Sequence, residues 1–303
     1  MKSVSHLELP VIDADLCIAC NKCIDVCPDR ILKTGREGEI IVLNEQCMLC
    51  GHCQAVCPVE AIAIPALTSH LGLQSMDEEE VSGLPGVSAA ALLQLMRARR
   101  SCRLFTKDPV ELSLLTDLVK IGTTAPSGTN SQGWQFIILP KRADVQRLGE
   151  TTAAFYRDLN NKAANPFYRL ISRLVAGEAL SNYYKKYYAT IKQGINDWDN
   201  NGVDRLFHGA SAAIVVGADQ SASCPAEDSL LATQNILLAA QSMGLGTCLI
   251  GFVVEAAKRD KRISTLLQLG DNEHIYSVIA CGYSAVTYKR AAGRRVVTPR
   301  IIN

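Results

Sequence analysis

The pattern of apolar residues predicts a large folded unit in the second part of the chain, beginning with a helix at Ser88. In SAAALLQLMRARRS, apolar residues between Ala91 and Met96 fall on one helical face, and Ser88 is a suitable N-cap. Pro109 precedes a second amphipathic stretch, ELSLLTDLVKIG, which predicts another helix.

Four apolar runs predict the strands of this unit. We expect strands in WQFIILP, AAIVVGAD, GTCLIGF and HIYSVIACGYS, and a long buried helix in EDSLLATQNILLAAQSMG. The order of these helices and strands is irregular, whereas a parallel βαβ fold would alternate them regularly. The sequence therefore predicts the α+β class, with a mixed sheet flanked by helices.

A stretch rich in turn-forming residues separates this unit from the N-terminal part of the chain. PALTSHLGLQSMDEEEVSGLPG contains two prolines, scattered glycines and serines, and an acidic run, which together favour a linker. The predicted domains are a small unit over residues 1–66, a linker over 67–87 and a large unit over 88–303.

Composition supports this division and excludes several classes of protein. The chain of 303 residues is long enough for a large and a small domain, and its hydrophobic fraction of 48% is sufficient for a core. The net charge of +1 gives no general field that would attract nucleic acid or an acidic membrane. No apolar run follows the first lysine, and the most apolar stretch, 230–254, is interrupted by polar residues and glycines. We therefore expect a cytoplasmic protein without a membrane span or a nucleic-acid partner.

Eight of the twelve cysteines form two copies of one motif. CIACNKCIDVCP and CMLCGHCQAVCP share the spacing C-x2-C-x2-C-x3-C-P. Three thiolates in one tight turn can hold three corners of an iron–sulfur cube, and the fourth cysteine starts a short helix that points toward the other cluster. The predicted ligands of cluster one are Cys17, Cys20, Cys23 and Cys57. Those of cluster two are Cys47, Cys50, Cys53 and Cys27.

Structural zinc is the alternative use of four cysteines. Zinc sites usually contain two C-x2-C pairs separated by a loop, whereas here three cysteines follow one another in steps of three before C-P. Disulfides are disfavoured because cytoplasmic thiols stay reduced. Residues 8–66 resemble the bacterial ferredoxins that hold two [4Fe-4S] clusters.

Four stretches of the large unit are candidate binding sites, although each has a plainer explanation. RARRSCRLF places arginines at a helix end, where cations also offset the helix dipole. APSGTNSQGWQF is a polar loop that could be a simple turn. GLGTCLIGF follows a helix and precedes a strand, which is the wrong order for a dinucleotide-binding glycine turn. GYSAVTYKRAAGRRVV is a basic tail that could be merely solvated.

Together, in this order and at these separations, the four stretches resemble the nitroreductase-type FMN domain over about residues 88–300. The resemblance implies that flavin phosphate and pyrimidine oxygens are held by Arg99, Arg100, Ser101 and Arg103. It implies that a loop reaching the flavin of a partner subunit contains Pro126, Ser127, Gly128 and Asn130. The stretch beside the flavin ring would be Leu249, Ile250 and Gly251, and the phosphate-binding residue of the tail would be Arg294. The family builds its flavin site across a two-fold interface, so a homodimer with FMN at the subunit interface is also implied.

The two resemblances together predict a flavo-iron–sulfur oxidoreductase. Electrons would enter through two [4Fe-4S] clusters, charge FMN and reduce an organic acceptor such as a nitroaromatic, a quinone or an activated double bond. The flavin itself would perform the chemistry, and no side chain is predicted as a catalytic acid or base. The sequence does not choose between ferredoxin and NAD(P)H as the electron donor.

Two alternatives remain open at this point. In the first, FMN dehydrogenates a small-molecule substrate and the clusters drain electrons to a ferredoxin-like partner. In the second, the protein is a redox or oxygen sensor without catalytic activity, and its clusters alter the binding of a partner.

Residues 155–207 match the resemblance poorly and contain much of the aromatic content. Four tyrosines at helical spacing are predicted to form one stripe: Tyr183, Tyr184, Tyr187 and Tyr188. The stripe either packs on the core or a dimer partner, or lines the substrate pocket as a lid whose hydroxyl groups donate a proton. The remaining cysteines are expected to be small buried hydrophobic residues: Cys102, Cys224, Cys248 and Cys281.

Overall fold

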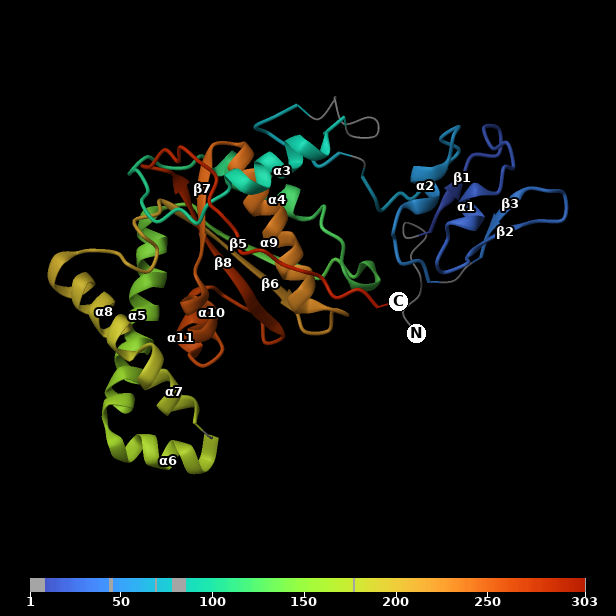
Figure 1. Cartoon of the computed structure of the whole chain (residues 1–303). Coiled ribbons are helices and arrows are strands. Elements are labelled where there is room, and N and C mark those ends of the chain that lie inside the picture. Colours follow the sequence, from blue (N-terminus) through green and yellow to red (C-terminus); the bar gives the residue numbers. More distant parts are fainter. Residues whose placement is uncertain (1–8, 44–45, 69, 78–85, 177, 303) are drawn as a thin grey trace.

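The computed structural model describes residues 9–43, 46–68, 70–77, 86–176 and 178–302, and it contains a small N-terminal unit beside a larger one (Figure 1). The elements of the small unit are β1 (Val11–Ile12), α1 (Lys22–Asp25), β2 (Leu32–Thr34), β3 (Ile40–Val42), α2 (His52–Val56) and β4 (Ile62–Ala63). Strand β1 pairs with β4 and β2 pairs with β3, both in antiparallel orientation. Each short helix contains the third cysteine of one motif.

The two cysteine motifs fold in the same way. Left-handed backbone φ angles recur at equivalent positions of the two motifs: Ala19 and Leu49, Asn21 and Gly51, and Arg30 and Glu60. Turns of this kind point successive N–H groups to one side and create a concave site for an anion. The core of the small unit contains Ile31, Leu32, Cys53, Ile62 and Ile64. The sequence repeat therefore builds two copies of one turn around a common core.

The large unit contains more helices than the sequence predicts. It begins with α3 (Ala89–Ala98), α4 (Leu112–Gly122) and β5 (Trp134–Leu139). Four helices then follow: α5 (Arg142–Ala164), α6 (Pro166–Ala176), α7 (Ala179–Lys186) and α8 (Tyr188–Asn201). The remaining elements are β6 (Ala212–Asp219), α9 (Pro225–Ser242), β7 (Leu245–Leu249), α10 (Gly251–Ala257), α11 (Lys261–Leu266) and β8 (Glu273–Tyr283).

The helices and strands that the apolar pattern predicts are confirmed, with one correction. The Ser88 hydroxyl accepts a hydrogen bond of 3.1 Å from the Ala91 N–H and caps α3 as expected. In GTCLIGF, however, the strand ends at Leu249, and Gly251 begins α10. An apolar run alone does not distinguish a buried strand from the first turn of a buried helix.

A four-stranded sheet in the order β5-β6-β8-β7 forms the centre of the large unit, and its three strand pairings are antiparallel. A parallel bridge between Ser101 and Thr247 adds the segment after α3 to the β7 edge. The fold is therefore of the predicted α+β class.

Helices cover both faces of this sheet (Figure 1). On one face, Ile214 of β6 belongs to the same buried cluster as Ile236 of α9. On the other face, Val215 belongs to the same cluster as Leu148 of α5. Alternate residues of a strand point to opposite faces, and both faces are buried here. This explains why AAIVVGAD is apolar without interruption.

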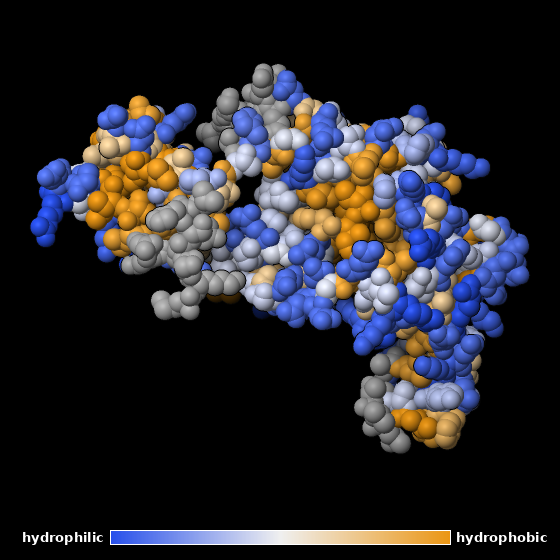
Figure 2. Space-filling view, turned by 180° about the vertical axis from the view of Figure 1, so that it is seen from behind, coloured by the Kyte–Doolittle hydropathy of each residue, from blue (hydrophilic) through white to orange (hydrophobic). Residues whose placement is uncertain are grey.

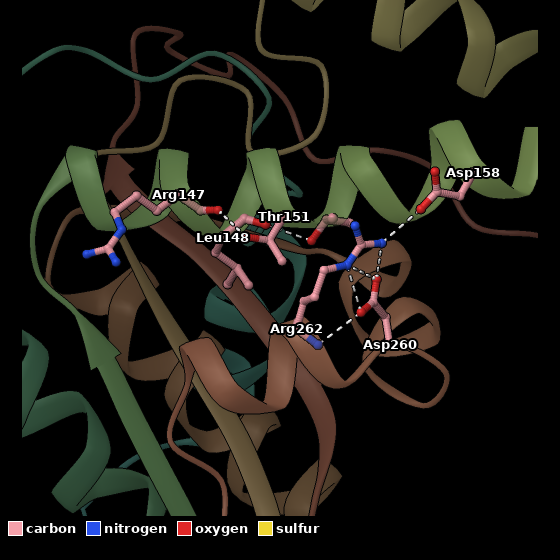
Figure 3. Close-up of polar contacts among 7 residues, drawn as sticks. Arg147, Leu148, Thr151, Asp158, Asp260 and Arg262 are labelled. Atoms are coloured by element: carbon pink, nitrogen blue, oxygen red, sulfur yellow. Dashed lines mark hydrogen bonds and ion pairs between the residues drawn. The ribbon is translucent and has the colours of Figure 1, made fainter.

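Helix α5 is joined to the start of α11 by a group of surface ion pairs (Figure 3). The Arg262 Nη2 atom lies 3.0 Å from Asp158 Oδ2 and 2.7 Å from Asp260 Oδ2. The Asp260 side chain also accepts a hydrogen bond from the Arg262 backbone N–H and caps α11. Exposed ion pairs stabilise a fold only weakly. The buried packing of α5 against the sheet therefore fixes this helix more strongly than these ion pairs do.

Apolar surface remains exposed on several parts of the chain. Helix α3 has no buried residue, although its sequence predicts an apolar face. The exposed large apolar residues of α3 and of the C-terminal tail include Leu92, Leu93, Met96, Val296, Val297, Ile301 and Ile302. Figure 2 shows further apolar surface on the small unit. Leu16 and Ile18 of this unit are among the exposed apolar residues. Among the described helices, none is long and apolar enough to cross a membrane.

Candidate functional site

The four cysteines predicted to hold cluster one surround a single cavity in the small unit. The cysteines that line this cavity are Cys17, Cys20, Cys23 and Cys57. Apolar side chains, among them Ile12 and Ile62, line the same cavity. The structure therefore brings the last cysteine of the second motif to the first three cysteines of the first motif.

The four cysteines predicted to hold cluster two also lie close together. Burial, together with the neighbouring thiols of Cys47, Cys50 and Cys27, raises the pKa of the Cys53 thiol to about 11. Burial likewise raises the pKa of the Cys47 thiol, and Asp29, Cys50 and Cys27 add to the rise. Cys27 can raise the pKa of Cys47 and Cys53 only if it lies close to them, so Cys27 of the first motif lies beside the second motif. Thiols that burial keeps protonated release protons when a metal binds.

The surroundings of these sulfur atoms fit an iron–sulfur cluster. The Leu49 N–H donates to Cys47 Sγ at 3.4 Å, and the Ala61 N–H donates to Cys57 Sγ at 3.2 Å. Hydrogen bonds to sulfur are one of the means by which a protein sets the potential of a cluster. Nowhere in the described ranges do three or more Cys, His, Asp or Glu side chains converge closely enough for a single metal ion. The cysteines of the first set are instead arranged around a cavity.

In the large unit, two of the predicted flavin-binding stretches meet at the β7 edge of the sheet. Ser101 forms a parallel bridge with Thr247, and the Cys102 N–H donates to the Thr247 carbonyl at 2.8 Å. The segment from Arg99 to Arg103 therefore runs beside β7, which ends at Leu249. Residues almost 150 positions apart in the sequence become neighbours in this way.

A cleft of about 1250 Å³ opens beside this edge. The predicted flavin residues that line it are Arg103, Leu249, Ile250 and Gly251. Aromatic side chains from α5, α7 and α10 line the same cleft: Phe155, Tyr156, Tyr183 and Phe252. A second cleft of about 940 Å³ shares Arg103, Tyr156 and Phe252 with the first. A large, mostly apolar cleft with a few polar groups is typical of a ligand-binding site.

Arg103 and Arg99 bring positive charge to the β7 edge beside the cleft. Burial raises the pKa of the Cys248 thiol, while the charges of Arg103 and Arg99 oppose this rise, so both guanidinium groups lie near Cys248. Glu255 also lines the cleft, but it pairs with Lys258 and Arg259. The arrangement can accept an anionic group beside a flat apolar surface.

The predicted flavin loop is organised by a residue that the sequence analysis does not identify, Asp228. This buried residue lies in the first turn of α9. Its Oδ1 atom accepts from the Gly128 N–H at 2.9 Å, and its Oδ2 atom accepts from the Ser131 hydroxyl at 3.3 Å. The Trp134 indole N–H donates to the Asp228 carbonyl at 3.1 Å. An acidic residue at a helix start is ordinarily explained by the helix dipole, so its sequence position gives no sign of this role.

Two glycines allow the loop to pack closely against the residues before α9. A Cβ atom on Gly128 would lie 2.9 Å from Cys224 Sγ, and one on Gly133 would lie 2.9 Å from the Ala222 Cβ. These distances are too short for a side chain. Gly133, just before β5, is therefore required here by close packing.

The loop faces the small unit. The Asn130 Nδ2 group donates to the carbonyl oxygens of Met48 and Leu49, each at 2.9 Å. Among the residues described as lining the two clefts, none comes from Pro126 to Asn130. The structure therefore places this part of the predicted flavin site beside the second cysteine motif of the same chain.

Three predicted flavin arginines, Arg99, Arg100 and Arg294, do not line the larger cleft, and neither does Ser101. Arg100 lines a separate cavity of about 680 Å³ together with Arg290 of the tail. Arg294 is exposed, and its guanidinium donates to the carbonyl of Gly293. One chain thus gathers Arg103, Leu249, Ile250 and Gly251 at the larger cleft, whereas the other predicted flavin residues do not line it. The roles of all these residues stay predictions.

Comparison with known protein families agrees with both units. Residues 96–283 match the model of the nitroreductase family, and residues 9–64 match the model of the 4Fe-4S dicluster domain. This chain belongs to the nitroreductase family. It is an oxidoreductase with a ferredoxin-type 4Fe-4S domain at its N-terminal end, so the predicted family, fold class and enzyme class are confirmed. The predicted domain boundaries at 66 and 87 stay predictions.

Individual relatives resemble one unit or the other. A 4-nitrobenzoate reductase from Pseudomonas putida is 26% identical over 202 residues, which cover 63% of this chain and 84% of that protein. A ferredoxin from Pyrobaculum islandicum is 38% identical over 63 residues, which cover 21% of this chain and 59% of the ferredoxin. The structure of a nitroreductase with bound FMN from Bacteroides fragilis is similar with a TM-score of 0.52 at 18% identity, covering 70% of this chain and 98% of that chain.

The tyrosines of this nitroreductase-family chain form two pairs, so the prediction of a single stripe is wrong. Helix α7 ends at Lys186 and α8 begins at Tyr188, but the i, i+4 contacts persist: the Tyr183 ring contacts that of Tyr187, and the Tyr184 ring contacts that of Tyr188. Tyr183 and Tyr187 line the larger cleft, and the Tyr183 hydroxyl donates to Asn160 Oδ1 at 2.7 Å. The rings of Tyr184 and Tyr188 are 4.7 Å apart and tilted by 37°, and neither residue is among those that line the two clefts. Burial raises the pKa of Tyr183 well above its ordinary value, so this hydroxyl stays protonated.

We expect His208, which lines both clefts, to make the stability of the enzyme depend on pH. Burial lowers the pKa of His208; Asp204 opposes this, and Arg103 adds to it. The unfolded chain therefore binds a proton more readily than the folded chain. The contribution of neutral His208 to the free energy of unfolding is fully present above the pKa of histidine in the unfolded chain. As the pH falls from there toward the pKa in the folded chain, this contribution is lost, by at most about 1.4 kcal/mol per pH unit.

Chemical denaturation under anaerobic conditions between pH 7.5 and 5.5 measures this dependence. The free energy of unfolding of His208→Asn should fall less on acidification than that of the wild type. Asparagine suits the site because His208 has a left-handed φ of 58°. The exposed His274→Asn is the control and should retain the wild-type slope. An equal slope for His208→Asn and the wild type would contradict the expectation.

Proposed function

We propose that this enzyme is a flavo-iron–sulfur oxidoreductase that binds two [4Fe-4S] clusters in its small unit and FMN in the cleft of its large unit. The observation that supports it best is the crossed arrangement of the cysteines. Cys57 completes the cavity of the first motif, and Cys27 lies beside the thiols of the second. Two motifs that complete each other are typical of two-cluster ferredoxins.

The proposed cluster ligands are the two sets that the sequence predicts. Cluster one would bind to Cys17, Cys20, Cys23 and Cys57, and cluster two to Cys47, Cys50, Cys53 and Cys27. The chain provides four thiolates to each, N–H groups that stabilise the sulfur charge, and apolar side chains that exclude water. When bound, the clusters supply single electrons and FMN supplies transfer of two-electron equivalents.

The cleft at the β7 edge is the proposed FMN site. Arg103 would hold an anionic or carbonyl oxygen of the flavin with its forked N–H donors. Leu249 and Ile250 would present an apolar surface to the ring, and Phe252 would exclude water from it. The similar Bacteroides fragilis structure contains FMN, which agrees with this assignment.

We propose a homodimer, because one chain leaves parts of the predicted flavin site and much apolar surface uncovered. The loop from Pro126 to Asn130 and Arg294 do not line the cleft of their own chain. The apolar face of α3 and four apolar residues of the tail are exposed. A second copy could cover these surfaces and add the missing flavin contacts. Dimers with two-fold symmetry are the commonest oligomers.

A nitroaromatic is the acceptor that we propose to test first. The Pseudomonas putida relative is named 4-nitrobenzoate reductase. In this chain, the cleft combines aromatic side chains with Arg103, which suits a flat ring carrying a negatively charged group. Quinones and activated double bonds are flat as well and form the comparison set.

Anaerobic purification followed by quantitation of iron, sulfide and flavin tests the proposal. We expect about eight irons and eight sulfides per chain, as two [4Fe-4S] clusters require, and one FMN. The oxidised enzyme is then mixed in a stopped-flow instrument with reduced ferredoxin or with NAD(P)H, and 4-nitrobenzoate turnover is measured with each donor. Zinc in place of iron, or a preparation without flavin, would refute the proposal.

A further inference from the structure

The segment that follows the small unit is fixed to the large unit a few residues after it leaves the ferredoxin core. The backbone N–H groups of Gln74 and Ser75 donate to Asp117 Oδ2 at 2.8 and 2.6 Å. The Ser75 hydroxyl donates to the same oxygen at 2.6 Å. Asp117 lies on α4 and is fully buried. Nearby, the Lys120 ammonium donates to the Gly72 carbonyl. Part of the predicted linker is therefore bound to α4.

This anchor limits how far the small unit can move. Leu67 packs against the core of the small unit, and Gly72 is held five residues later. Five residues of extended chain span at most about 18 Å. Burial raises the pKa of Asp117, but the hydrogen bonds from Ser75 and Gln74 and the charge of Lys120 outweigh it and hold the pKa below its ordinary value. The anchor is thus a charged acceptor at neutral pH.

A second contact joins the two units at the second cysteine motif. The Asn130 amide donates to the carbonyl oxygens of Met48 and Leu49, both at 2.9 Å. These two carbonyl groups lie between Cys47 and Cys50 of the proposed cluster two. Figure 1 shows that α2, within the same motif, lies on the side of the small unit that faces the large unit.

The loop that presents Asn130 has a strained backbone. Thr129, Asn130 and Gln132 have left-handed φ angles of 51°, 51° and 47°. Residues other than glycine adopt such angles at an energetic cost, which the surrounding structure must offset. Asp228 holds the loop on both sides of Asn130, through the Gly128 N–H and the Ser131 hydroxyl.

The two cysteine motifs differ in burial at equivalent positions, although their backbones match. In the first motif, the three residues that follow the first cysteine, up to and including the second cysteine, are exposed: Ile18, Ala19 and Cys20. Their counterparts in the second motif are half-buried: Met48, Leu49 and Cys50. The contact with Asn130 lies at the half-buried motif. One proposed cluster site therefore faces solvent, and the other faces the large unit.

We propose that Asn130 and Asp117 form a two-point clasp that fixes the second cysteine motif against the nitroreductase unit, with Asn130 as a positioning residue. The inference rests on the proposed function in one respect. If the clusters bind as proposed, cluster two is the one held at the junction, and cluster one is the one open to an external one-electron carrier protein. The position of the small unit is inferred from the described contacts of Asn130 and Asp117, independently of the clusters.

An Asn130→Asp variant tests the clasp in the anaerobic holoenzyme. Aspartate has the same size and tolerates the left-handed backbone, but it places a carboxylate oxygen opposite the two carbonyl oxygens. Loss of two hydrogen bonds of ordinary net strength should shift the equilibrium between docked and undocked small unit by about 30-fold. Asn130→Gly also suits the backbone and removes the donor without adding charge. Asn161→Asp, on the exposed surface of α5, is the charge-matched control.

Three measurements are made on each variant. Small-angle X-ray scattering reports the maximum dimension, hydrogen exchange reports the protection of residues 46–53, and stopped-flow absorbance reports how fast flavin bleaches with reduced ferredoxin. We expect both Asn130 variants to increase the maximum dimension, lower the protection by up to about 30-fold and slow bleaching, whereas Asn161→Asp matches the wild type.

Wild-type dimension and protection in both Asn130 variants, or loss of FMN without any change in dimension, would overturn the clasp. Missing clusters or flavin in the wild type would overturn the proposed function and leave the scattering test valid.

Discussion

We expect a Cys57→Ser variant to lose the cluster that is held mainly by the first motif, although Cys57 belongs to the second. The structure places Cys57 in one cavity with Cys17, Cys20 and Cys23. Serine removes the thiolate, and a cube left with three cysteine ligands is open at one corner. Iron should therefore fall from about eight to about four atoms per chain, with a matching loss of sulfide.

Double variants show which cluster is lost. If Cys57 and Cys20 serve the same cluster, Cys57→Ser combined with Cys20→Ser retains about four irons per chain, as either single variant does. If Cys50 serves the other cluster, Cys57→Ser combined with Cys50→Ser retains almost none. Iron analysis and low-temperature electron paramagnetic resonance of the reduced proteins provide the measurement.

The control for this series is Cys224→Ser, because Cys224 lies beside the loop of the large unit and belongs to neither set. It should keep both clusters. The opposite result would be that Cys57→Ser with Cys20→Ser loses almost all iron, whereas Cys57→Ser with Cys50→Ser retains about four irons per chain. That pattern would show that each motif holds its own cluster. That result would contradict the crossed arrangement on which the proposed function rests.

The second large effect is expected from Arg103→Ala, which should weaken FMN binding by about 10- to 100-fold. Arg103 lines both clefts, and its charge acts on Cys248 and His208 at the β7 edge. Hydrogen bonds from a guanidinium to a charged or carbonyl oxygen are among the stronger ones in proteins. The FMN affinity of Arg103→Lys should lie between those of the wild type and Arg103→Ala, because lysine keeps the positive charge but lacks the forked N–H donors of a guanidinium. Quenching of flavin fluorescence on titration with the flavin-free protein gives the dissociation constant.

Arg262→Ala is the matched control for loss of one arginine. Arg262 is held by Asp158 and Asp260 on the surface between α5 and α11 (Figure 3) and lines neither cleft. Its removal should lower the free energy of unfolding only slightly, because solvent screens exposed ion pairs, and leave FMN affinity unchanged. Equal FMN affinity of Arg103→Ala and the wild type would exclude the β7 edge as the flavin site.

Much of the fold can be predicted from the sequence because local chemistry specifies it. The cysteine motif is a short segment whose spacing defines a turn, and the two copies adopt the same left-handed angles. Ser88 caps α3 with its own hydroxyl. The apolar run of β6 follows from burial on both faces. In each case the signal and the structure lie within a few residues of each other.

The candidate site is less predictable because its parts come from distant segments. Asp228 organises a loop about 100 residues earlier in the chain, and its position at a helix start has an ordinary explanation. Tyr183 and Tyr184 are consecutive residues of α7, and successive residues of a helix point in directions about 100° apart. Only Tyr183 of these two lines the larger cleft.

By itself, the sequence determined the two cysteine motifs, the α+β order of the elements and the resemblance to the nitroreductase family, because each depends on residue type at short range. The tertiary structure decided which motif faces the large unit and which faces solvent. It also directed Asn130 toward Met48 and Leu49 and placed Arg103 beside β7. These arrangements depend on how two separately folded units pack, and the two motifs, which are nearly equivalent in sequence, acquire different surroundings only through that packing.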